Sequence, residues 1–333
     1  MPLSYVDDYG QFSPTMHNGW HVGVVIPAKD EELFIGAVLD TIPDFVDSVV
    51  VIDDGSSDGT SKVANNYQGQ SYNLTVIRLE GKGVGAAIDT GHREMLRNCP
   101  KPFVSVVMAG DGQMDPEDLV RVINPIVEQQ CDYVKGNRFM HPDGLGNMPK
   151  VRRFASQILA FLTTLASGIA VSDPQCGYTA TSHQVLEEWN WTKSWNKYGY
   201  PNYWLIELSK LSFSVIEVPV KSIYGDEKSK LKMLRFLFSV GMMMFVMLHK
   251  RCLSMLFNRN VVPHSIFSLV AYSIGWIAII PSISTDLERE IANSTVGILF
   301  LVGISWMAAH IFDRMAVKTR IELRKNAQAR QTK

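Results

Sequence analysis

The sequence predicts an α/β protein with a mostly parallel, Rossmann-like sheet and helices on both faces, followed by membrane-associated helices. Two observations lead to this fold class. The first third of the chain alternates short β-branched runs with segments of helical spacing, as is typical of a parallel sheet covered by helices. The C-terminal part instead contains two long stretches without a charged residue, as expected for helices that cross a bilayer.

Strands are expected at four apolar runs, namely HVGVVIPA at 21–28, the first half of 46–60, NLTVIRLE at 73–80 and PFVSVVMAGD at 102–111. Helical spacing is found between them, at 30–44, from about Ser61, and at 83–96. Three of the runs lead into polar clusters, which are Lys29-Asp30-Glu31-Glu32, Asp53-Asp54 and Asp111-Gly112-Gln113. Because such sheets bind ligands at the carboxyl ends of their strands, the three clusters together predict one site at that edge.

Two uncharged stretches near the C-terminus are each long enough to cross a membrane. They run from Val261 to Thr285 and from Ile291 to Phe312, and about 20 apolar residues suffice for a span. Basic residues flank the pair on both sides, and the loop STDLERE separates the two stretches. By the positive-inside rule both flanks are cytoplasmic and the loop faces outward. We therefore expect a transmembrane hairpin at 261–313, with helices at about 264–284 and 292–312, followed by a basic cytoplasmic tail at 314–333.

Two further apolar runs are expected to lie against the membrane surface. Residues 154–172 are uncharged and long enough to span, but a span would separate the motifs GNRF and DPQCGY, which we expect to share one site. Residues 236–248 are too short to span, and basic residues flank them within 231–258. This arrangement suits an amphipathic helix at anionic headgroups, and the alternative is an ordinary core helix.

The composition argues against several classes of partner and site. The formal net charge is −1, so no excess of positive charge points to nucleic acid. The four cysteines show neither CxxC spacing nor a disulfide framework, which indicates reduced thiols and no zinc site. Residues 1–20 are expected to form a tail, because their polar and acidic start lacks the features of a signal peptide.

Asp53 and the glycine-rich stretch near Lys82 are candidates for contact with a nucleotide. A carboxylate at a strand end accepts hydrogen bonds from a base or a ribose, although Asp53 is equally suited to capping the following helix. Gly81, Gly83 and Gly85 alternate, but the spacing is not GxGxxG and no GK[ST] sequence follows. Neither a dinucleotide fingerprint nor a P-loop is therefore expected. Lys82 either faces a diphosphate or is a solvated loop lysine.

Asp111 and Gln113 carry the oxygen ligands that a hard cation such as Mg²⁺ or Mn²⁺ prefers. Mg²⁺ typically binds one or two carboxylates and completes its coordination with substrate phosphates and water. Ala109 stands where a second carboxylate would strengthen such a site. Asp115, which precedes Pro116, is expected to cap a helix that begins there.

Five motifs follow one another along the chain, in the order VVIPAKDEE, VVVIDDGSSDGT, VVMAGDGQMDPED, KGNRF and DPQCGY. In this order they resemble the inverting GT-A glycosyltransferases of family 2, and most closely the polyprenyl-phosphate sugar synthases of the dolichol-phosphate mannose synthase type. The resemblance covers roughly residues 20–250 and implies a GT-A catalytic domain at 21–230. The C-terminal hairpin also resembles that of membrane-anchored members of the group.

The resemblance implies which positions bind the donor. Those expected to hold the nucleotide sugar are Pro27, Lys29, Glu31, Asp53, Gly110 and Asp111, together with Lys82, the candidate given above for the diphosphate. Asp111 and Gln113 match the second Asp and the following Gln of the metal motif, whose first Asp is replaced by Ala109. Lys228 and Lys230 lie in the segment that closes over the diphosphate, where the group often has an arginine.

The resemblance also implies an acceptor side. Arg138 and Arg152 match arginines that bind phosphate near the acceptor. Asp173, Gln175 and Tyr178 match positions of the acceptor-side block DPQCGY. Asp111, Arg138 and Asp173 are the expected catalytic residues.

Together these features predict an enzyme that moves a sugar from a UDP- or GDP-linked nucleotide sugar to a membrane-embedded polyprenyl phosphate. The acceptor phosphate is already anionic, so no strong base is required, and a divalent ion at Asp111 would stabilise the leaving diphosphate. The protein would be integral to the cytoplasmic membrane, with its catalytic domain and both termini in the cytoplasm. The alternatives are a transferase acting on a sugar hydroxyl, with Asp173 as its base, and a non-catalytic nucleotide-sugar-binding membrane protein.

Overall fold

The computed structural model describes residues 17–67, 71–143, 148, 150–196, 199–223, 233–254, 261–280 and 295–331. The chain divides into two compact units. The first comprises residues 1–160, 171–204 and 214–240, and the second comprises 161–170, 205–213 and 241–333.

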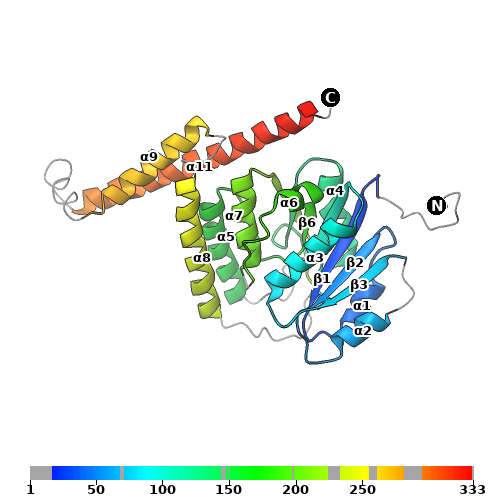
Figure 1. The fold of residues 1–333 in the computed structure, drawn as a ribbon. Coiled ribbons are helices and arrows are strands. Elements are labelled where there is room, and N and C mark those ends of the chain that lie inside the picture. Colours follow the sequence, from blue (N-terminus) through cyan, green and yellow to red (C-terminus); the bar gives the residue numbers. More distant parts are fainter. Residues whose placement is uncertain are drawn as a thin grey trace. The chain divides into compact units, whose positions relative to one another are not determined.

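The first unit is built on a seven-stranded sheet with the order β3-β2-β1-β4-β6-β5-β7. Strands β1, β2 and β3 lie side by side in Figure 1. The strands are β1 His21–Ala28, β2 Ser48–Asp53, β3 Asn73–Arg78, β4 Phe103–Val107, β5 Tyr133–Asn137, β6 Thr179–Ser182 and β7 Val215–Pro219. Only β6 runs antiparallel to its neighbours. The predicted, mostly parallel sheet is therefore confirmed, and the four expected strands correspond to β1–β4.

Helices cover both faces of this sheet, as predicted. On one face α1 (Ile35–Asp40), α2 (Thr60–Asn66) and α4 (Leu119–Val127) share a buried core with alternate residues of the strands. On the other face α3 (Val84–Asn98) lies so close to β1 that a Cβ at Gly91 would overlap Val25. Between α6 (His183–Glu188) and α7 (Tyr200–Leu211), Trp189 stacks on Trp204 of α7 with 3.8 Å between ring centroids.

The helix expected at 30–44 is shorter than its sequence pattern suggested. Asp30 has a φ of +57°, and its carboxylate accepts hydrogen bonds from the Ser57 backbone and side chain. The Glu31 amide donates to the Thr60 hydroxyl at 2.8 Å. Because the turn after β2 takes up these polar groups, residues before Ile35 form a loop at the carboxyl end of β1.

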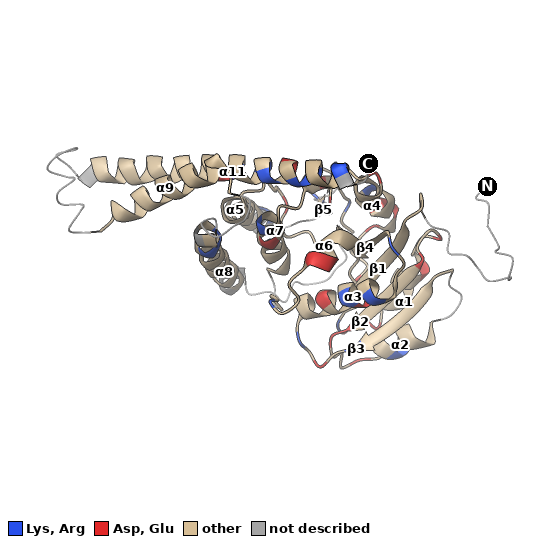
Figure 2. Ribbon diagram, turned by 45° about the horizontal axis from the view of Figure 1, so that its top comes forward, with Lys and Arg blue, Asp and Glu red and all other residues tan. Residues whose placement is uncertain are grey.

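The second unit contains the end of α5 (Lys150–Ser167), most of α8 (Met233–Ser254), α9 (Pro263–Ile277) and α11 (Thr295–Gln331). Helices α9 and α11 pack antiparallel, because Phe267 contacts Phe312 while Trp276 contacts Trp306. The predicted tail at 314–333 continues α11 as one helix up to Gln331. Figure 2 shows α9 and the first half of α11 without charge and basic residues in the second half.

Among the described residues, one helix is long and apolar enough to cross a membrane by its length and composition, at Gly297–Arg330. Helix α9 has 15 residues, and residues 281–294, which contain the predicted outward loop, lie outside the described part. The transmembrane hairpin therefore stays a prediction.

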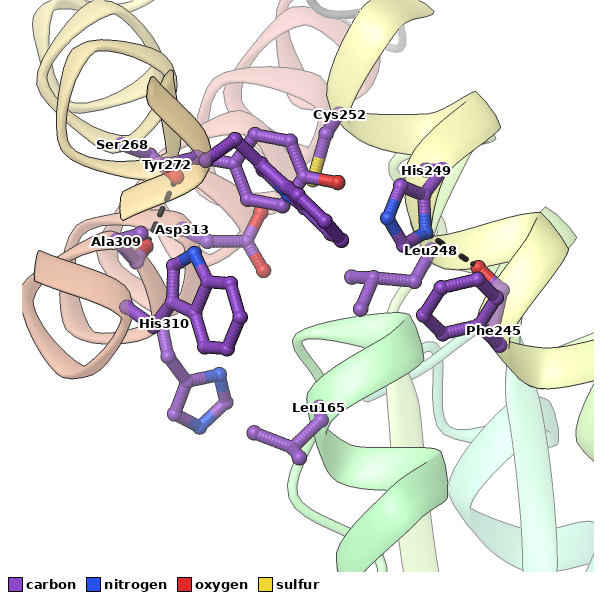
Figure 3. A pocket seen from close by; sticks show the side chains of 12 residues that line it. Leu165, Phe245, Leu248, His249, Cys252, Ser268, Tyr272, Ala309, His310 and Asp313 are labelled. Carbon is purple, nitrogen blue, oxygen red and sulfur yellow. Dashed lines mark hydrogen bonds between the residues drawn. The ribbon is translucent and has the colours of Figure 1, made fainter. Parts of the chain in front are cut away.

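A buried ion pair and an apolar cavity lie within the second unit. Arg251 binds Asp313 through both terminal nitrogens, at 2.8 and 2.6 Å, and its Nε donates to the Ala166 carbonyl at 2.7 Å. The nearby cavity of about 200 Å³ is lined mostly by aromatic and aliphatic side chains, including Trp276 and Trp306. Figure 3 shows Phe245, Leu248 and Tyr272 around it.

Candidate functional site

The predicted site residues meet at one edge of the sheet. The carboxyl ends of the parallel strands lie there, together with the start of antiparallel β6. The predicted residues that the structure describes at this edge are Pro27, Lys29, Glu31, Asp53, Lys82, Gly110, Asp111, Gln113, Arg138, Asp173, Gln175 and Tyr178. Lys228 and Lys230 lie outside the described residues, and Arg152 belongs to α5 but its side chain is not described.

Asp53 ends β2 and is fully buried, with 0% of its surface exposed. Its carboxylate accepts hydrogen bonds from the Ser56 amide at 2.8 Å, from the Ser61 hydroxyl and from Arg78 at 2.8 Å. Burial alone would raise the pKa of Asp53, but the hydrogen bonds from Ser56 and Ser61 and the charge of Arg78 hold it below its usual value. Asp53 is therefore an ionised anchor of the turn at this edge.

Asp54, which the sequence placed in a polar cluster without giving it a role of its own, organises the loop that carries Lys82. It is buried, and its carboxylate accepts from the Lys82 amide at 2.7 Å and from the Gly83 amide at 2.9 Å. A Cβ on Gly81 would lie 3.7 Å from the Lys29 ammonium, so Lys29 lies beside this loop. Only its position next to Asp53 at a strand end could have pointed to Asp54.

The alternating glycines after β3 have a packing role. A Cβ at Gly83 would overlap the carbonyl oxygen of Asn196, and one at Gly85 would overlap that of Trp195. The Gly85 amide also donates to the Asn196 carbonyl at 3.2 Å. The glycines thus let the segment before α7 approach the start of α3 closely.

The loop after β4 is held against the end of β1. The Gly110 amide donates to the Pro27 carbonyl at 3.1 Å, and a Cβ on Gly110 would lie 3.0 Å from that of Ala28. Asp111 accepts from the Gln113 amide at 3.0 Å. The Gln113 carbonyl accepts from the Ile223 amide at 2.9 Å, so the chain leading toward Lys228 and Lys230 begins beside this loop.

Asp111 offers one carboxylate at this edge, and Gln113 offers a neighbouring amide. Across the described ranges, no group of three or more His, Cys, Asp or Glu side chains is placed to hold a metal ion. One carboxylate still fits a hard cation whose remaining ligands are substrate phosphates and water. The predicted capping role of Asp115 is confirmed, because its side chain accepts from the Glu117 amide at 3.0 Å.

Arg138 and Asp173 form a buried bidentate ion pair. Arg138 Nε and Nη2 donate to the two carboxylate oxygens at 2.7 and 2.9 Å, and the Arg138 amide donates at 3.1 Å. Arg138 is 7% exposed and Asp173 is 0% exposed. Burial would raise the pKa of Asp173, but the hydrogen bonds and charge of Arg138 hold it below its usual value. A carboxylate stabilised in this way is a weak base.

Lys135 and Glu217 are charged residues near this pair that sequence reasoning missed. Lys135 in β5 is fully buried, and its ammonium donates to the Cys176 carbonyl. Burial lowers the pKa of Lys135 to about 8. Glu217 in β7 accepts from Ser172 and Asp173. Lys135 is the first residue of the motif KGNRF, but no strand was expected at β5 or β7, so no sequence signal pointed to Glu217.

Gln175 and Tyr178 are both engaged with other parts of the protein. Gln175 donates to Asn202 at 2.6 Å. The hydroxyl of Tyr178, a side chain that is 1% exposed, donates to the Asp115 carbonyl at 3.2 Å. Burial raises the pKa of Tyr178 well above its usual value. In this arrangement Tyr178 joins the start of β6 to the loop after β4.

Comparison with known proteins identifies similar sequences. The sequence profile of glycosyl transferase family 2 matches residues 23–189. A UDP-N-acetylglucosamine–dolichyl-phosphate N-acetylglucosaminyltransferase of Methanococcus voltae is 31% identical, and the match covers 61% of this chain and 86% of that protein. A polyprenol monophosphomannose synthase of Mycolicibacterium smegmatis is 30% identical, with 59% and 75% covered.

Solved structures show the same fold at lower identity. Glucosyl-3-phosphoglycerate synthase of Mycobacterium tuberculosis, in complex with Mg²⁺ and UDP, is 20% identical with a TM-score of 0.51. The match covers 70% of this chain and 80% of that one. The profile spans half of the chain and contains most of β1, all of β2 to β6 and most of the residues described above. The protein is therefore a member of glycosyl transferase family 2.

Proposed function

We propose that the protein transfers a sugar from a nucleoside-diphosphate sugar to a polyprenyl phosphate at the cytoplasmic face of a membrane. The observation that carries this proposal is the convergence of the Asp53 turn, the Asp111 loop and the Arg138–Asp173 pair at one edge of the sheet. The similar proteins named for transfer to dolichyl phosphate and for polyprenol monophosphomannose synthesis support the choice of acceptor.

The donor would bind over the ends of β1, β2 and β4. Pro27, Lys29, Glu31 and Asp53 would form the nucleotide side, where the loop after β1 and the turn after β2 are held together by hydrogen bonds. Lys29 and Lys82 are both exposed and belong to adjacent loops, so their charges suit a diphosphate. Lys228 and Lys230 would add positive charge over it.

A divalent ion, Mg²⁺ or Mn²⁺, would be held by Asp111 and Gln113 together with the donor diphosphate. Its presence in the glucosyl-3-phosphoglycerate synthase complex with UDP supports this choice. When bound, such an ion neutralises charge on the leaving diphosphate. Asp111 would orient it, and the close contact of Gly110 with Pro27 would keep the loop against the nucleotide side.

The acceptor phosphate would bind near Arg138, with help from Arg152 and Gln175, and the buried Tyr178 would contribute by holding the loop after β4. The low pKa of Asp173 favours an acceptor that needs no deprotonation, because the ion pair with Arg138 makes Asp173 a weak base. A sugar hydroxyl would need such a base, so the geometry favours a phosphate acceptor. Asp173 would then act by holding Arg138.

Several surfaces support attachment to a membrane. Helix α5 exposes Val151, Phe154 and Ile158 along one side, as expected for a helix that lies on lipid. Helices α9 and α11 would form the transmembrane hairpin. The apolar cavity in the second unit suits a hydrocarbon chain (Figure 3).

Incubation of the purified protein with radiolabelled sugar nucleotides, Mn²⁺ or Mg²⁺ and a polyprenyl phosphate tests this function. We expect a labelled lipid that mild acid hydrolyses, as a sugar joined to a lipid monophosphate should be. The product should be absent with Asp111→Ala or with EDTA. Label appearing only in lipid-diphosphate glycans would overturn the proposal in favour of a hydroxyl acceptor.

A further inference from the structure

We propose that Glu217 is a positioning residue for the acceptor side of the site. Through the loop before β6 it would fix Asp173, and through Asp173 it would fix the guanidinium of Arg138. This inference rests on the proposed function, in which Arg138 meets the acceptor phosphate. Glu217 lies in β7, outside the part of the chain that matches the family profile.

Glu217 holds two consecutive residues of the acceptor-side loop. The Ser172 amide donates to both of its carboxylate oxygens at 2.9 and 3.0 Å, and the Ser172 hydroxyl donates at 3.1 Å. The Asp173 amide donates to the same carboxylate at 3.1 Å. One carboxylate in a regular strand therefore fixes the backbone of the residue whose side chain binds Arg138.

Asp173 passes this constraint on to Arg138. Its carboxylate receives three hydrogen bonds from Arg138, one from the backbone and two from the guanidinium. A bidentate carboxylate leaves a guanidinium a single orientation. A donor held in this way loses little conformational entropy when a phosphate binds, so its orientation contributes to acceptor affinity.

The charges around the pair balance only when Glu217 is included. Lys135 in β5 lies opposite Glu217 in β7 in the register of the parallel pair. Lys135 and Arg138 supply two positive charges, and Asp173 and Glu217 supply two negative charges. Without Glu217, Asp173 would be the only carboxylate of this set beside two buried cations. The Asp173 amide would then lose its acceptor, and two cations would compete for the Asp173 carboxylate.

The test is a comparison of Glu217→Gln with Glu187→Gln in the full-length protein. Glu187 is also ion-paired, to Lys101, but it lies in α6, which follows the end of antiparallel β6 and so begins at the opposite edge of the sheet. For Glu217→Gln we expect the KM for polyprenyl phosphate to rise by about tenfold, as for loss of one charged hydrogen bond. The KM for the sugar nucleotide should stay unchanged, and Glu187→Gln should change neither.

Binding of farnesyl phosphate gives a second readout that does not depend on turnover. Its dissociation constant should rise for Glu217→Gln while that of the nucleoside diphosphate stays at the wild-type value. Glu217→Asp keeps the charge but shortens the reach by one methylene, so it should resemble Glu217→Gln. Wild-type behaviour of Glu217→Asp would overturn positioning in favour of a purely electrostatic effect.

Three further outcomes distinguish a failure of this inference from a failure of the proposed function. If the wild-type protein makes lipid-monophosphate sugar and Glu217→Gln keeps the wild-type acceptor KM, the positioning role is wrong and the function stands. If both KM values rise together with a fall in thermal stability, Glu217 is a general structural residue and the inference is also overturned. If the wild-type protein makes no such product, the function and the inference fail together.

Discussion

Asp53 and Asp54 are neighbours in sequence whose carboxylates bind different parts of the site. The Asp53 carboxylate accepts from Ser61 and Arg78 and so fixes the turn after β2. The Asp54 carboxylate accepts from the amides of Lys82 and Gly83 and so holds the loop after β3 against the end of β2. Because both residues follow an apolar run, the sequence predicts that their carboxylates lie at this edge of the sheet. The partners of each side chain come from residues up to 29 positions away, and no local pattern specifies them.

Asp53→Asn should destabilise the fold in a pH-dependent way. At pH 7 we expect a loss of about 2 kcal/mol, because an amide replaces a buried carboxylate that accepts several hydrogen bonds. The folded pKa of Asp53 lies below its unfolded value, so its contribution is complete above about pH 4 and is lost as pH falls through the folded pKa. Thermal unfolding should show a lower unfolding temperature for Asp53→Asn than for the wild type at pH 7. This difference should shrink as the pH is lowered.

Asp44→Asn provides the matched control for this experiment, because Asp44 is exposed. It should change the unfolding temperature little at any pH. A difference between wild type and Asp53→Asn that stays constant down to the lowest pH would contradict the assigned pKa direction.

Ala109→Asp should tighten metal binding in the absence of donor. A second carboxylate beside Asp111 would add both a ligand and a negative charge to the cation site. Titration with Mn²⁺, followed by calorimetry, should show a lower dissociation constant. Ala109→Asn, which adds an oxygen without a charge, should have a smaller effect. Unchanged Mn²⁺ affinity in both variants would mean that position 109 does not face the ion.

At the scale of single elements, the glycine-rich stretch after β3 has glycines that serve tertiary packing, although glycine-rich loops often bind phosphate. Its spacing does not match a phosphate-binding motif, and the structure supplies another reason for Gly83 and Gly85. Both lie against the backbone of residues 195–196, which come more than one hundred positions later in the chain. Such an approach between distant backbones leaves no periodic signal in the sequence.

Gly85→Ala should destabilise the first unit, because the added methyl would overlap the Trp195 carbonyl. A loss of roughly 2 kcal/mol is expected for overpacking against a backbone atom. The control is Gly36→Ala in α1, where the added Cβ would make an ordinary 3.6 Å contact with Val63. Alanine favours a helix over glycine, so the control should be neutral or slightly stabilising. Equal unfolding temperatures for the two variants would contradict this packing.

At the scale of the whole molecule, the chain combines a sheet-based unit with a helical unit. The helical unit contains two long uncharged stretches and ends in a basic segment. Helix α11 begins in the apolar stretch and continues into the basic segment without a break. The basic flank that follows the second apolar stretch is therefore carried on the same helix as that stretch. Residues 281–294, which would form the outward loop, lie outside the described residues.

The predicted topology can be tested with reporter fusions. Green fluorescent protein fused after Lys333 should fluoresce, and alkaline phosphatase at the same position should be inactive, because this end is expected in the cytoplasm. Alkaline phosphatase inserted into the loop STDLERE should be active. An active phosphatase at Lys333, together with an inactive phosphatase in the loop, would show that the orientation is the opposite of the predicted one.

Much of the fold and the location of the site follow from short-range patterns. Strands β1 to β4, helix α3 and the edge at which Asp53 and Asp111 meet were all predicted, because alternation and strand-end polarity are properties of neighbouring residues. The extent of α1 was not, because Asp30 and Glu31 bind the turn after β2 and end the helical pattern early.

The partners of the buried charges could not be predicted in the same way. Asp132 lies six residues before Arg138 in the sequence, but its carboxylate accepts from Ser214, and Arg138 binds Asp173, 35 residues further on. The proximity of Glu217 to this site follows only from the pairing of β7 with β5. Local order along the chain determines which segments form strands and helices, and so where the polar ends of the strands lie. The pairing of distant strands decides which buried carboxylate lies beside which cation. A buried charge needs a partner, and only the folded sheet determines which oppositely charged group lies within hydrogen-bond distance.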